Sequence, residues 1–582
     1  MMPWVFLAMI DDPIAPPYAL IPTHLTCEYQ IDPKGIGARE PLLSWQIVSS
    51  NPNARNQFPT AYRVLVASER ELLDMGRGDL WDSGKVDSAD SRYVRWGGQP
   101  LPSRQRAFWK VRIWDQDGVE QPWSADASFS VGLLEKSDWQ AEWIGHDAPI
   151  AESREMPDFE GALWIGHESE VKGEQPMATR AFRHELSLNP SEVSQAWLLV
   201  TGDDEFDAYL NGRLVAKSDQ RPHSWTRPET VDVSPLLRPG RNVIAVRIRN
   251  TLSGWAGLLG KLLLARKDGS KLESTTGPDW KCADGWDDRW ADPSFDDSAW
   301  PQAKTLGEYG DSPWGRVPPR GMFLPPPRYL RRGFQIEKPI SHATLHATAL
   351  GIYEARINGK RVAEALFLPG WTDYNLRIPT HSFDVTGLLQ QGENVWSVLL
   401  ADGWFAGYVG YGGQRNHYGD ALRFLGQLEI EYEDGTKKTV ATGPDWRAST
   451  GGLREADFLM GETFDSSAEP WGWDARGFEE KDWQPVEIGS AIQPLLEPAK
   501  HQPVAVIARF EPLSVSQVGP DAYVLDLGQN IAGYAQLELT AERGREITLR
   551  YAERLDAEGK LYTTNLRGAR AVDKYVCRGE GI

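Results

Sequence analysis

Two acidic side chains and one amide form one candidate binding site in this sequence. Asp203 and Asp204 are neighbours at the start of a predicted strand, and Asn250 ends a later strand that is soon followed by Trp255. Their carboxylate and amide oxygens could contact a ligand, and a flat indole ring can stack on the C–H face of a sugar. The same residues also suit a structural role, with the aspartates in a turn and Asn250 as a strand-end cap.

A second candidate is the glycine- and aromatic-rich stretch 400–420. The side chains in it that could contact a ligand are Trp404, Tyr411, Arg415 and His417. Its glycines leave the backbone free to turn, and its rings need a surface to pack on. Packing between domains and the shaping of a pocket in a neighbouring domain both fit this composition.

No catalytic residue can be assigned from the sequence. The 82 aspartates and glutamates show no spacing that would pair two carboxylates, and neither a His-Glu-x-x-His nor a Gly-x-Ser-x-Gly motif is present. The stretch 257–261 has the glycines and lysine of a phosphate loop. However, Trp255 stands where the first glycine is required, and Leu262 stands where Ser or Thr is required.

Charge and composition restrict the partners. A net charge of −20 excludes nucleic acid and is compatible with a neutral sugar. The 25 tryptophans fit sugar stacking, but large aromatics also fill β-sandwich cores. No stretch approaches the roughly 18 apolar residues of a membrane span, so we predict no membrane partner. Residues 1–10 lack the basic residues of a secretory signal, and the three cysteines are far apart. We predict a cytoplasmic protein, with secretion as the alternative.

Short alternating runs separated by Gly, Pro, Asn and Asp predict an all-β chain of tandem β-sandwiches. A length of 582 residues allows about four domains. Residues 1–19 are predicted to form a tail. Residues 20–134 resemble a fibronectin type III module, since strands such as 61–68 and 108–115 alternate and carry strand tryptophans.

An internal repeat occupies the middle of the chain. Residues 201–216 and 348–363 both read as two alternating strands joined by Asn-Gly, which is a type I′ hairpin signal. Farther on, residues 232–243 match 384–395, and Gly-Pro-Asp-Trp follows in both copies. The pattern resembles the galactose-binding-like jelly-roll β-sandwich. We predict two such units, joined by a stiff proline-rich connector, at residues 139–318 and 329–488.

The last segment, 495–582, predicts the beginning of a further β-sandwich. Its alternating stretches predict strands at 533–539, 546–554 and 572–577. Three strands without a partner sheet leave their edges unpaired and one apolar face bare. We therefore expect either that more chain follows in the native protein or that this end is poorly ordered.

Three motifs in one order point to a family. They are Gly-Trp-Phe-Ala-Gly from Gly403, Gly-Glu-Thr-Phe-Asp from Gly461 and Asp-Leu-Gly-Gln-Asn from Asp526. With them the chain resembles, from about residue 20 to 580, the N-terminal half of a bacterial α-L-rhamnosidase of glycoside hydrolase family 78. In that family an (α/α)6 barrel follows the β-domains and holds the active site. Nothing in this sequence matches the barrel, so the resemblance implies a chain that is inactive alone.

The resemblance also implies a reaction and a ligand. The whole enzyme would release terminal non-reducing α-L-rhamnose from glycosides or polysaccharides by an inverting mechanism. The 139–318 unit would be a rhamnose-binding module. In it Asp203, Asp204 and Asn250 would hold a calcium ion that contacts the sugar, with Asp204 in place of the family's Asn. Leu350 and Gly351 occupy the corresponding places in the second copy, so we expect no such site there.

Two other functions stay open. The chain could be a stand-alone carbohydrate-binding or adhesion protein, or it could hold the accessory domains of another glycosidase. The resemblance requires no cofactor other than the calcium in the 139–318 unit, and it leaves a homodimer open.

Overall fold

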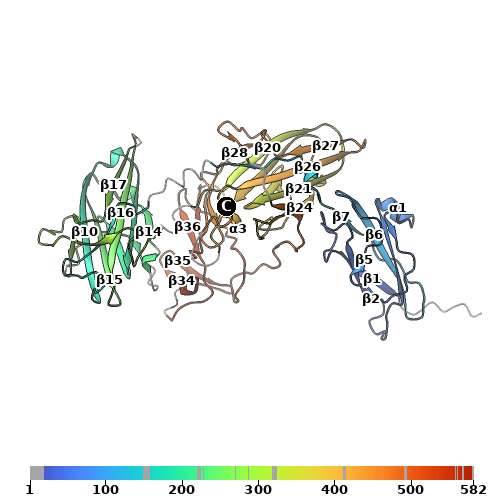
Figure 1. The fold of residues 1–582 in the computed structure, drawn as a ribbon, viewed down its shortest axis with the longest axis horizontal. Helices are drawn as coiled ribbons and strands as arrows, with labels where there is room; N and C mark the ends of the chain where they lie inside the picture. The colour runs from blue at the N-terminus through green and yellow to red at the C-terminus, as the bar shows by residue number, and fades with distance from the viewer. Residues whose placement is uncertain are drawn as a thin grey trace, which may run out of the picture.

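The protein is described from a computed structural model that covers residues 19–147, 158–218, 224–226, 228–268, 270–285, 287–317, 324–409, 415–489, 494–557, 559, 561–566 and 569–579. Within these residues the α-helices are short, α1 (Arg70–Asp74) and α3 (Gly403–Ala406), and the sheets dominate (Figure 1). The prediction of an all-β chain of tandem sandwiches is confirmed. No helix in the described part is long and apolar enough to cross a membrane.

The N-terminal domain is a sandwich of two antiparallel sheets. In spatial order, one sheet holds β1 (Leu20–Cys27), β2 (Leu42–Ser49) and β5 (Val94–Arg95), and the other holds β4 (Trp81–Asp82), β3 (Ala61–Ala67), β6 (Arg106–Trp114) and β7 (Ala127–Ser130). The tryptophans of the predicted strands, Trp45 and Trp109, lie between the sheets with at most 2% of their surface exposed. Alternation along β6 thus buries one face, as a period of two requires.

The first of the repeated units is a larger sandwich, which we call the first sandwich. One sheet runs β13 (Arg213–Lys217), β12 (Glu205–Leu210), β15 (Gly240–Asn250), β10 (Ala178–Leu188), β18 (Lys281–Ala283). The facing sheet runs β14 (Glu229–Asp232), β11 (Val193–Asp203), β16 (Gly257–Arg266), β9 (Leu163–Gly166), β19 (Lys304–Glu308), and β17 (Lys271–Thr275) also pairs with β16.

The second sandwich repeats this strand order. One sheet runs β23 (Lys360–Arg361), β22 (Ile352–Ile357), β25 (Gly392–Ala401), β20 (Arg328–Ile336), β28 (Arg447–Ser449), β31 (Gln484–Pro485). The other runs β32 (Glu487–Ile488), β8 (Ile144–Gly145), β26 (Arg423–Tyr432), β21 (Ile340–Leu350), β24 (Arg377–Asp384), β33 (Leu495–Pro498), and β27 (Lys437–Ala441) also pairs with β26. Figure 1 shows the two sandwiches as separate bodies along the long axis.

The same hairpin closes the corresponding strands of both sandwiches. Asn211 and Asn358 have φ angles of 52° and 51°, and each is followed by a glycine that also has positive φ, as a type I′ turn requires. Asn211 Nδ2 donates to Asn242 Oδ1 over 2.9 Å, and Asn358 Nδ2 donates to Asn394 Oδ1 over 2.9 Å. The asparagines of the two matched sequence blocks are therefore partners in one turn network.

The strand β8 belongs to a different sandwich from the one that the predicted ranges give it. It lies inside the range 139–318 expected for the first copy, but it pairs with β26 and β32 of the second sandwich. Trp-Ile-Gly-His occurs at 143–146 and again at 164–167, so β8 and β9 are the corresponding first strands of the two copies. The first sandwich is therefore inserted between the first strand of the second sandwich and the rest of it.

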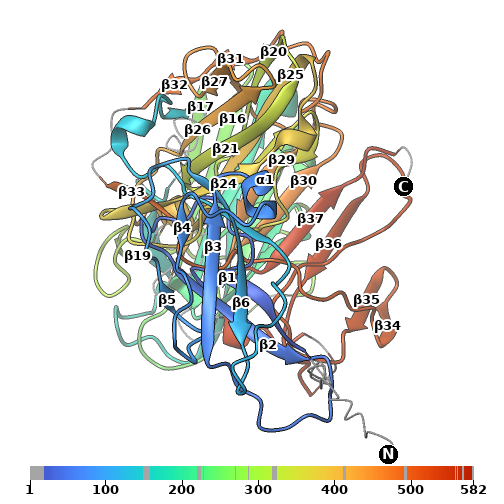
Figure 2. The ribbon, with the colours of Figure 1, turned by 90° about the vertical axis from the view of Figure 1, so that its right-hand side faces the viewer.

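The C-terminal strands attach to a hairpin of the second sandwich. A four-stranded sheet joins β29 (Leu453–Asp457), β30 (Gly461–Asp465), β37 (Val572–Val576), β36 (Glu546–Arg550), and a separate hairpin is formed by β34 (Ser514–Gly519) and β35 (Ala522–Asp526). Figure 2 shows both at one side of the molecule. The strand expected at 533–539 is not formed. Tyr534 and Leu537 are 65% and 48% exposed, because no described sheet faces their apolar side chains.

Candidate functional site

The structure brings Asp203, Asp204 and Asn250 to one end of the first sandwich. Asp203 is the last residue of β11, Asp204 links it to β12, and Asn250 is the last residue of β15. Because β12 and β15 pair in antiparallel register, Glu205 lies opposite Arg249 and the two ends coincide. Asp204 Oδ2 accepts hydrogen bonds from the Thr251 backbone N over 2.9 Å and from Thr251 Oγ1 over 2.7 Å.

Asp203 is a buried carboxylate, with 5% of its surface exposed. Trp314 Nε1 donates a hydrogen bond of 2.8 Å to its Oδ2. Burial raises the pKa of Asp203 to about 7, and the nearby Asp204 adds to this rise, although the bond from Trp314 opposes it. Burial would also raise the pKa of Asp204, but the hydrogen bonds from Thr251 and from Asp203 hold it below its ordinary value. Asp204 therefore carries more of the negative charge of the pair than Asp203 does.

Asn250 contributes an unsatisfied acceptor. Its Nδ2 donates to the carbonyl of Pro176 over 2.8 Å, while its buried Oδ1 has no hydrogen-bond partner. A buried polar atom without a partner is costly, so it points to a ligand at this place. Among the described residues, no group of three His, Cys, Asp or Glu side chains could hold a metal. A site here would therefore depend on the Asn250 amide as well as on the two carboxylates.

Aromatic rings flank these groups. Trp255 is 37% exposed and packs edge-on against Trp314, with ring centroids 5.3 Å apart. Trp314 in turn stacks on Trp164 at 4.3 Å, and the Lys172 ammonium lies 5.8 Å from the Trp255 ring. Sequence reasoning found Trp255 but missed Trp314, because a loop tryptophan 111 residues from Asp203 carries no local signal.

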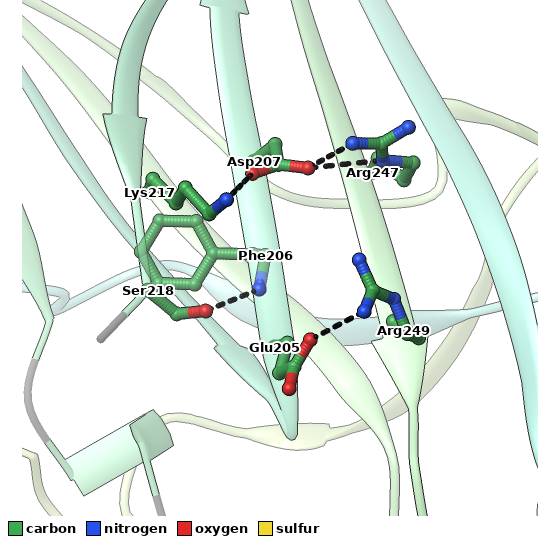
Figure 3. Close-up of a pocket in the computed structure, with 7 residues that line it drawn as sticks. All are labelled: Glu205, Phe206, Asp207, Lys217, Ser218, Arg247 and Arg249. Atoms are coloured by element: carbon green, nitrogen blue, oxygen red, sulfur yellow. Dashed lines mark hydrogen bonds and ion pairs between the residues drawn. The ribbon is translucent and has the colours of Figure 1, made fainter. Parts of the chain in front are cut away.

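Ion pairs between β12, β13 and β15 hold the ends of these strands in register (Figure 3). Arg249 pairs with Glu205 at 3.0 Å, and Arg247 pairs with Asp207, which also lies 3.9 Å from the Lys217 ammonium. They surround only a small pocket of about 10 Å³. Their side chains are engaged with one another, so we assign them to positioning Asp204 and Asn250.

The residues of the 400–420 stretch have separate surroundings. Trp404 lies on α3, with its ring 4.4 Å from Phe458. Arg415 forms an ion pair with the buried Asp402, and His417 packs edge-on against Tyr418 at 4.7 Å. Tyr411 lies outside the described residues. The described contacts favour packing over a shared ligand site, and they do not bring these residues to Asp203.

The second sandwich has no counterpart of the acidic pair. Its β21 ends at Leu350 and its β22 begins at Ile352, as β11 ends at Asp203 and β12 begins at Glu205. Leu350 and Gly351 therefore occupy the places of the two aspartates. Neither side chain offers an oxygen ligand.

Family models match three parts of the chain in order. The matches are the Rha78A-like, N-terminal immunoglobulin domain over residues 22–135, the alpha-L-rhamnosidase N-terminal domain over 338–508 and the bacterial alpha-L-rhamnosidase concanavalin-like domain over 516–582. The first describes as immunoglobulin-like the sandwich that the sequence likened to fibronectin type III, and both names refer to one two-sheet architecture.

Known relatives are similar over almost the whole chain. An alpha-L-rhamnosidase of Streptomyces avermitilis is 39% identical over 569 residues, which are 97% of this chain and 54% of the relative. One from Alteromonas sp. is 26% identical, over 95% of this chain and 42% of its own length. The chain spans about half the length of the curated relatives it matches.

Solved structures of two α-L-rhamnosidases are also similar to this chain over almost its whole length. The Streptomyces avermitilis alpha-L-rhamnosidase complexed with L-rhamnose superposes with a TM-score of 0.77 at 38% identity, over 97% of this chain and 54% of that one. The native enzyme of Aspergillus terreus reaches 0.61 at 23% identity, over 97% and 45%, which supports the fold alone.

Proposed function

We propose that this chain, whose domains match three α-L-rhamnosidase family models in order, is part of an enzyme that hydrolyses terminal, non-reducing α-L-rhamnose residues of glycosides or polysaccharides. The order of the three family matches carries this proposal. A free-standing carbohydrate-binding protein is the second candidate, favoured by the buried Asn250 oxygen without a partner.

We place the chemistry outside the residues described. In an inverting glycosidase one carboxylic acid protonates the glycosidic oxygen, and a second carboxylate activates water across the ring. Such a pair faces the sugar ring from two sides, whereas Asp203 and Asp204 interact directly with each other. We assign no catalytic residue in this chain and place the reaction on a helical barrel of the family type.

The first sandwich is proposed to bind rhamnose with calcium. Asp203, Asp204 and Asn250 would hold the ion, since two carboxylates and an unsatisfied amide oxygen suit its preference for oxygen ligands. When bound, calcium would offer open coordination positions to sugar hydroxyls. Trp255, partly exposed beside them, would stack on the sugar ring.

Titration calorimetry tests the sugar module. We expect the purified chain to bind L-rhamnose in calcium and to bind at least tenfold more weakly after chelation, because the ion supplies the contact. Asp203→Ala with Asp204→Ala should cause the same loss, whereas Asp279→Asn, at an exposed carboxylate of the same sandwich, should not. Equal binding with and without chelator would contradict the calcium site, and no binding in either condition would leave the sandwich as scaffold.

Hydrolysis is a separate test. We expect the 582-residue chain to release no aryl alcohol from an aryl α-L-rhamnoside above a blank without protein, because the proposed acid and base lie elsewhere. The positive control is a full-length relative under the same conditions. Turnover by this chain would disprove the assignment of the chemistry to a barrel domain.

A cytoplasmic location and a homodimer stay predictions. The three cysteines are buried free thiols, which suits a reducing compartment.

A further inference from the structure

A cavity of about 300 Å³ lies where the N-terminal domain meets the second sandwich. One wall comes from the loop 30–36 of the N-terminal domain, and the others come from β24 and from residues near 363–365 and 499–503. The two domains are in close contact at Gly35, where a Cβ would lie 2.2 Å from Ser382 Oγ. An ion pair between Arg104 and Glu429 at 2.9 Å also joins them. The cavity is therefore bordered by direct contacts between the two domains.

The charge of this cavity contrasts with that of the whole chain. The protein has 82 acidic and 62 basic residues, yet none of the described side chains that line the cavity is acidic. Its charged lining residue is Lys34, whose Nζ lies 3.2 Å from Ser128 Oγ at an exposed position. Asp384 lies in electrostatic range of Lys34, and Ser128 Oγ also donates to Asp32 Oδ1 over 3.2 Å. Neither carboxylate forms an ion pair with Lys34 in the described part of the chain, so the cavity offers a cation without a direct acidic partner.

Polar groups that suit hydroxyls lie on β24. His381 Nε2 donates to the Pro369 carbonyl over 3.0 Å. Burial lowers the pKa of His381 to about 4, so at neutral pH the ring is uncharged and its Nδ1 is an acceptor. Thr380 and Ser382 lie on either side of His381 in the strand, with Ser382 Oγ 2.8 Å from His346 Nδ1, and Phe383 adds an apolar ring to the lining. One cation, one acceptor, two hydroxyls and a ring match a ligand with one carboxylate and several hydroxyls.

We propose that this junction cavity binds a small sugar acid, with the carboxylate paired to Lys34 and the hydroxyls bonded to His381, Thr380 and Ser382. The volume stands at the small end of the range of ligand pockets, which fits a monosaccharide. Small-molecule sites combine a few fixed polar groups with apolar walls, and domain junctions are common places for them. The site is independent of Asp203 and of the proposed rhamnose module.

Calorimetry with two matched sugars tests the proposal. The whole chain is titrated in chelator with sodium D-glucuronate and with D-glucose, which share ring and size and differ in the carboxylate. We expect glucuronate to bind at least tenfold more tightly than glucose, because only glucuronate can pair with Lys34. Lys34→Gln should weaken glucuronate binding at least tenfold, whereas Lys136→Gln, at an exposed lysine that does not line the cavity, should leave it unchanged.

The location of the glucuronate site, and its independence from the first sandwich, are checked separately. Hydrogen exchange should slow at residues 33–36 and 380–383 when glucuronate is added. Asp203→Ala should keep glucuronate binding, so failure of the rhamnose module would not affect this result. The proposal is overturned if the two sugars bind equally, if 10 mM glucuronate gives no heat, if Lys34→Gln binds as the unmodified chain does, or if Asp203→Ala abolishes the binding.

Discussion

Trp396→Ala is expected to lower the free energy of unfolding of the second sandwich by about 3–5 kcal/mol, the cost of a large buried aromatic. Trp396 lies on β25 with none of its surface exposed. Its ring meets Trp446 edge-on at 4.9 Å, and a Cβ at Gly426 would lie 2.7 Å from the same ring. Because Gly426 has no side chain, it cannot fill the cavity that removal of the Trp396 indole would leave.

Urea denaturation followed by tryptophan fluorescence measures this loss. The matched control is Trp371→Ala, which removes an equal side chain from a position 60% exposed on the same sandwich. We expect the control to change the free energy of unfolding by less than about 0.5 kcal/mol. Similar losses in both variants would show that β25 does not carry the core of this sandwich.

The internal repeat explains why much of the fold could be predicted from sequence. Asn-Gly fixes a turn of one hand, so Asn211 and Asn358 determine which strands pair. The boundary of the inserted sandwich could not be placed in this way, since β8 is only two residues long and pairs with strands beyond residue 420. The repeated Trp-Ile-Gly-His was the available signal, because it marks the first strand of each copy.

Both sandwiches also share an arginine that packs on a phenylalanine ring and pairs with an acid, and only the tertiary contacts identify this second repeat. Arg183 lies over the Phe295 ring and pairs with Asp297. Arg331 lies in the same way over Phe478 and pairs with Glu480. Each arginine is more than 100 residues from its acid, so composition and spacing give no hint of the pairing. The candidate site has the same limit, because Asp203 and Asn250 could be chosen from their types, whereas Trp314 and Thr251 depend on the tertiary fold.

Acidification from pH 7 to pH 4.5 is expected to lower the free energy of unfolding through His346 by about 2–3 kcal/mol. His346 is 3% exposed, and its Nδ1 lies 2.8 Å from Ser382 Oγ. Burial lowers its pKa to about 4, against about 6.5 in an unfolded chain. Between these values the unfolded state binds more protons than the folded state, so the stability is complete above pH 6.5 and is lost as the pH falls towards 4.

The charged groups that face His346 do not cancel this effect. Glu429 Oε2 lies 3.8 Å from His346 Nε2 and favours the protonated ring, and Asp138 acts in the same direction. Burial, aided by Arg104, outweighs these two carboxylates and lowers the pKa. The pKa of Asp138 itself lies below the pH range of this experiment. Burial would raise its pKa, yet hydrogen bonds, beginning with that from Ser103, hold it at about 2. Its stabilisation is lost only below pH 4, outside the measured window.

The variant His346→Gln isolates the contribution of His346 to the pH dependence of the free energy of unfolding. Urea denaturation at pH 7 and pH 4.5 should show that the variant loses about 2–3 kcal/mol less than the unmodified chain on acidification, because glutamine binds no proton. His381, whose pKa burial also lowers to about 4, adds a loss in both proteins, whereas Asp203, whose pKa burial raises to about 7, opposes that loss in both. His24→Gln, at an exposed position of the N-terminal domain, should leave the loss unchanged. If His346→Gln and His24→Gln respond alike to acid, His346 is not held neutral at the domain junction, and the pH dependence belongs to other groups.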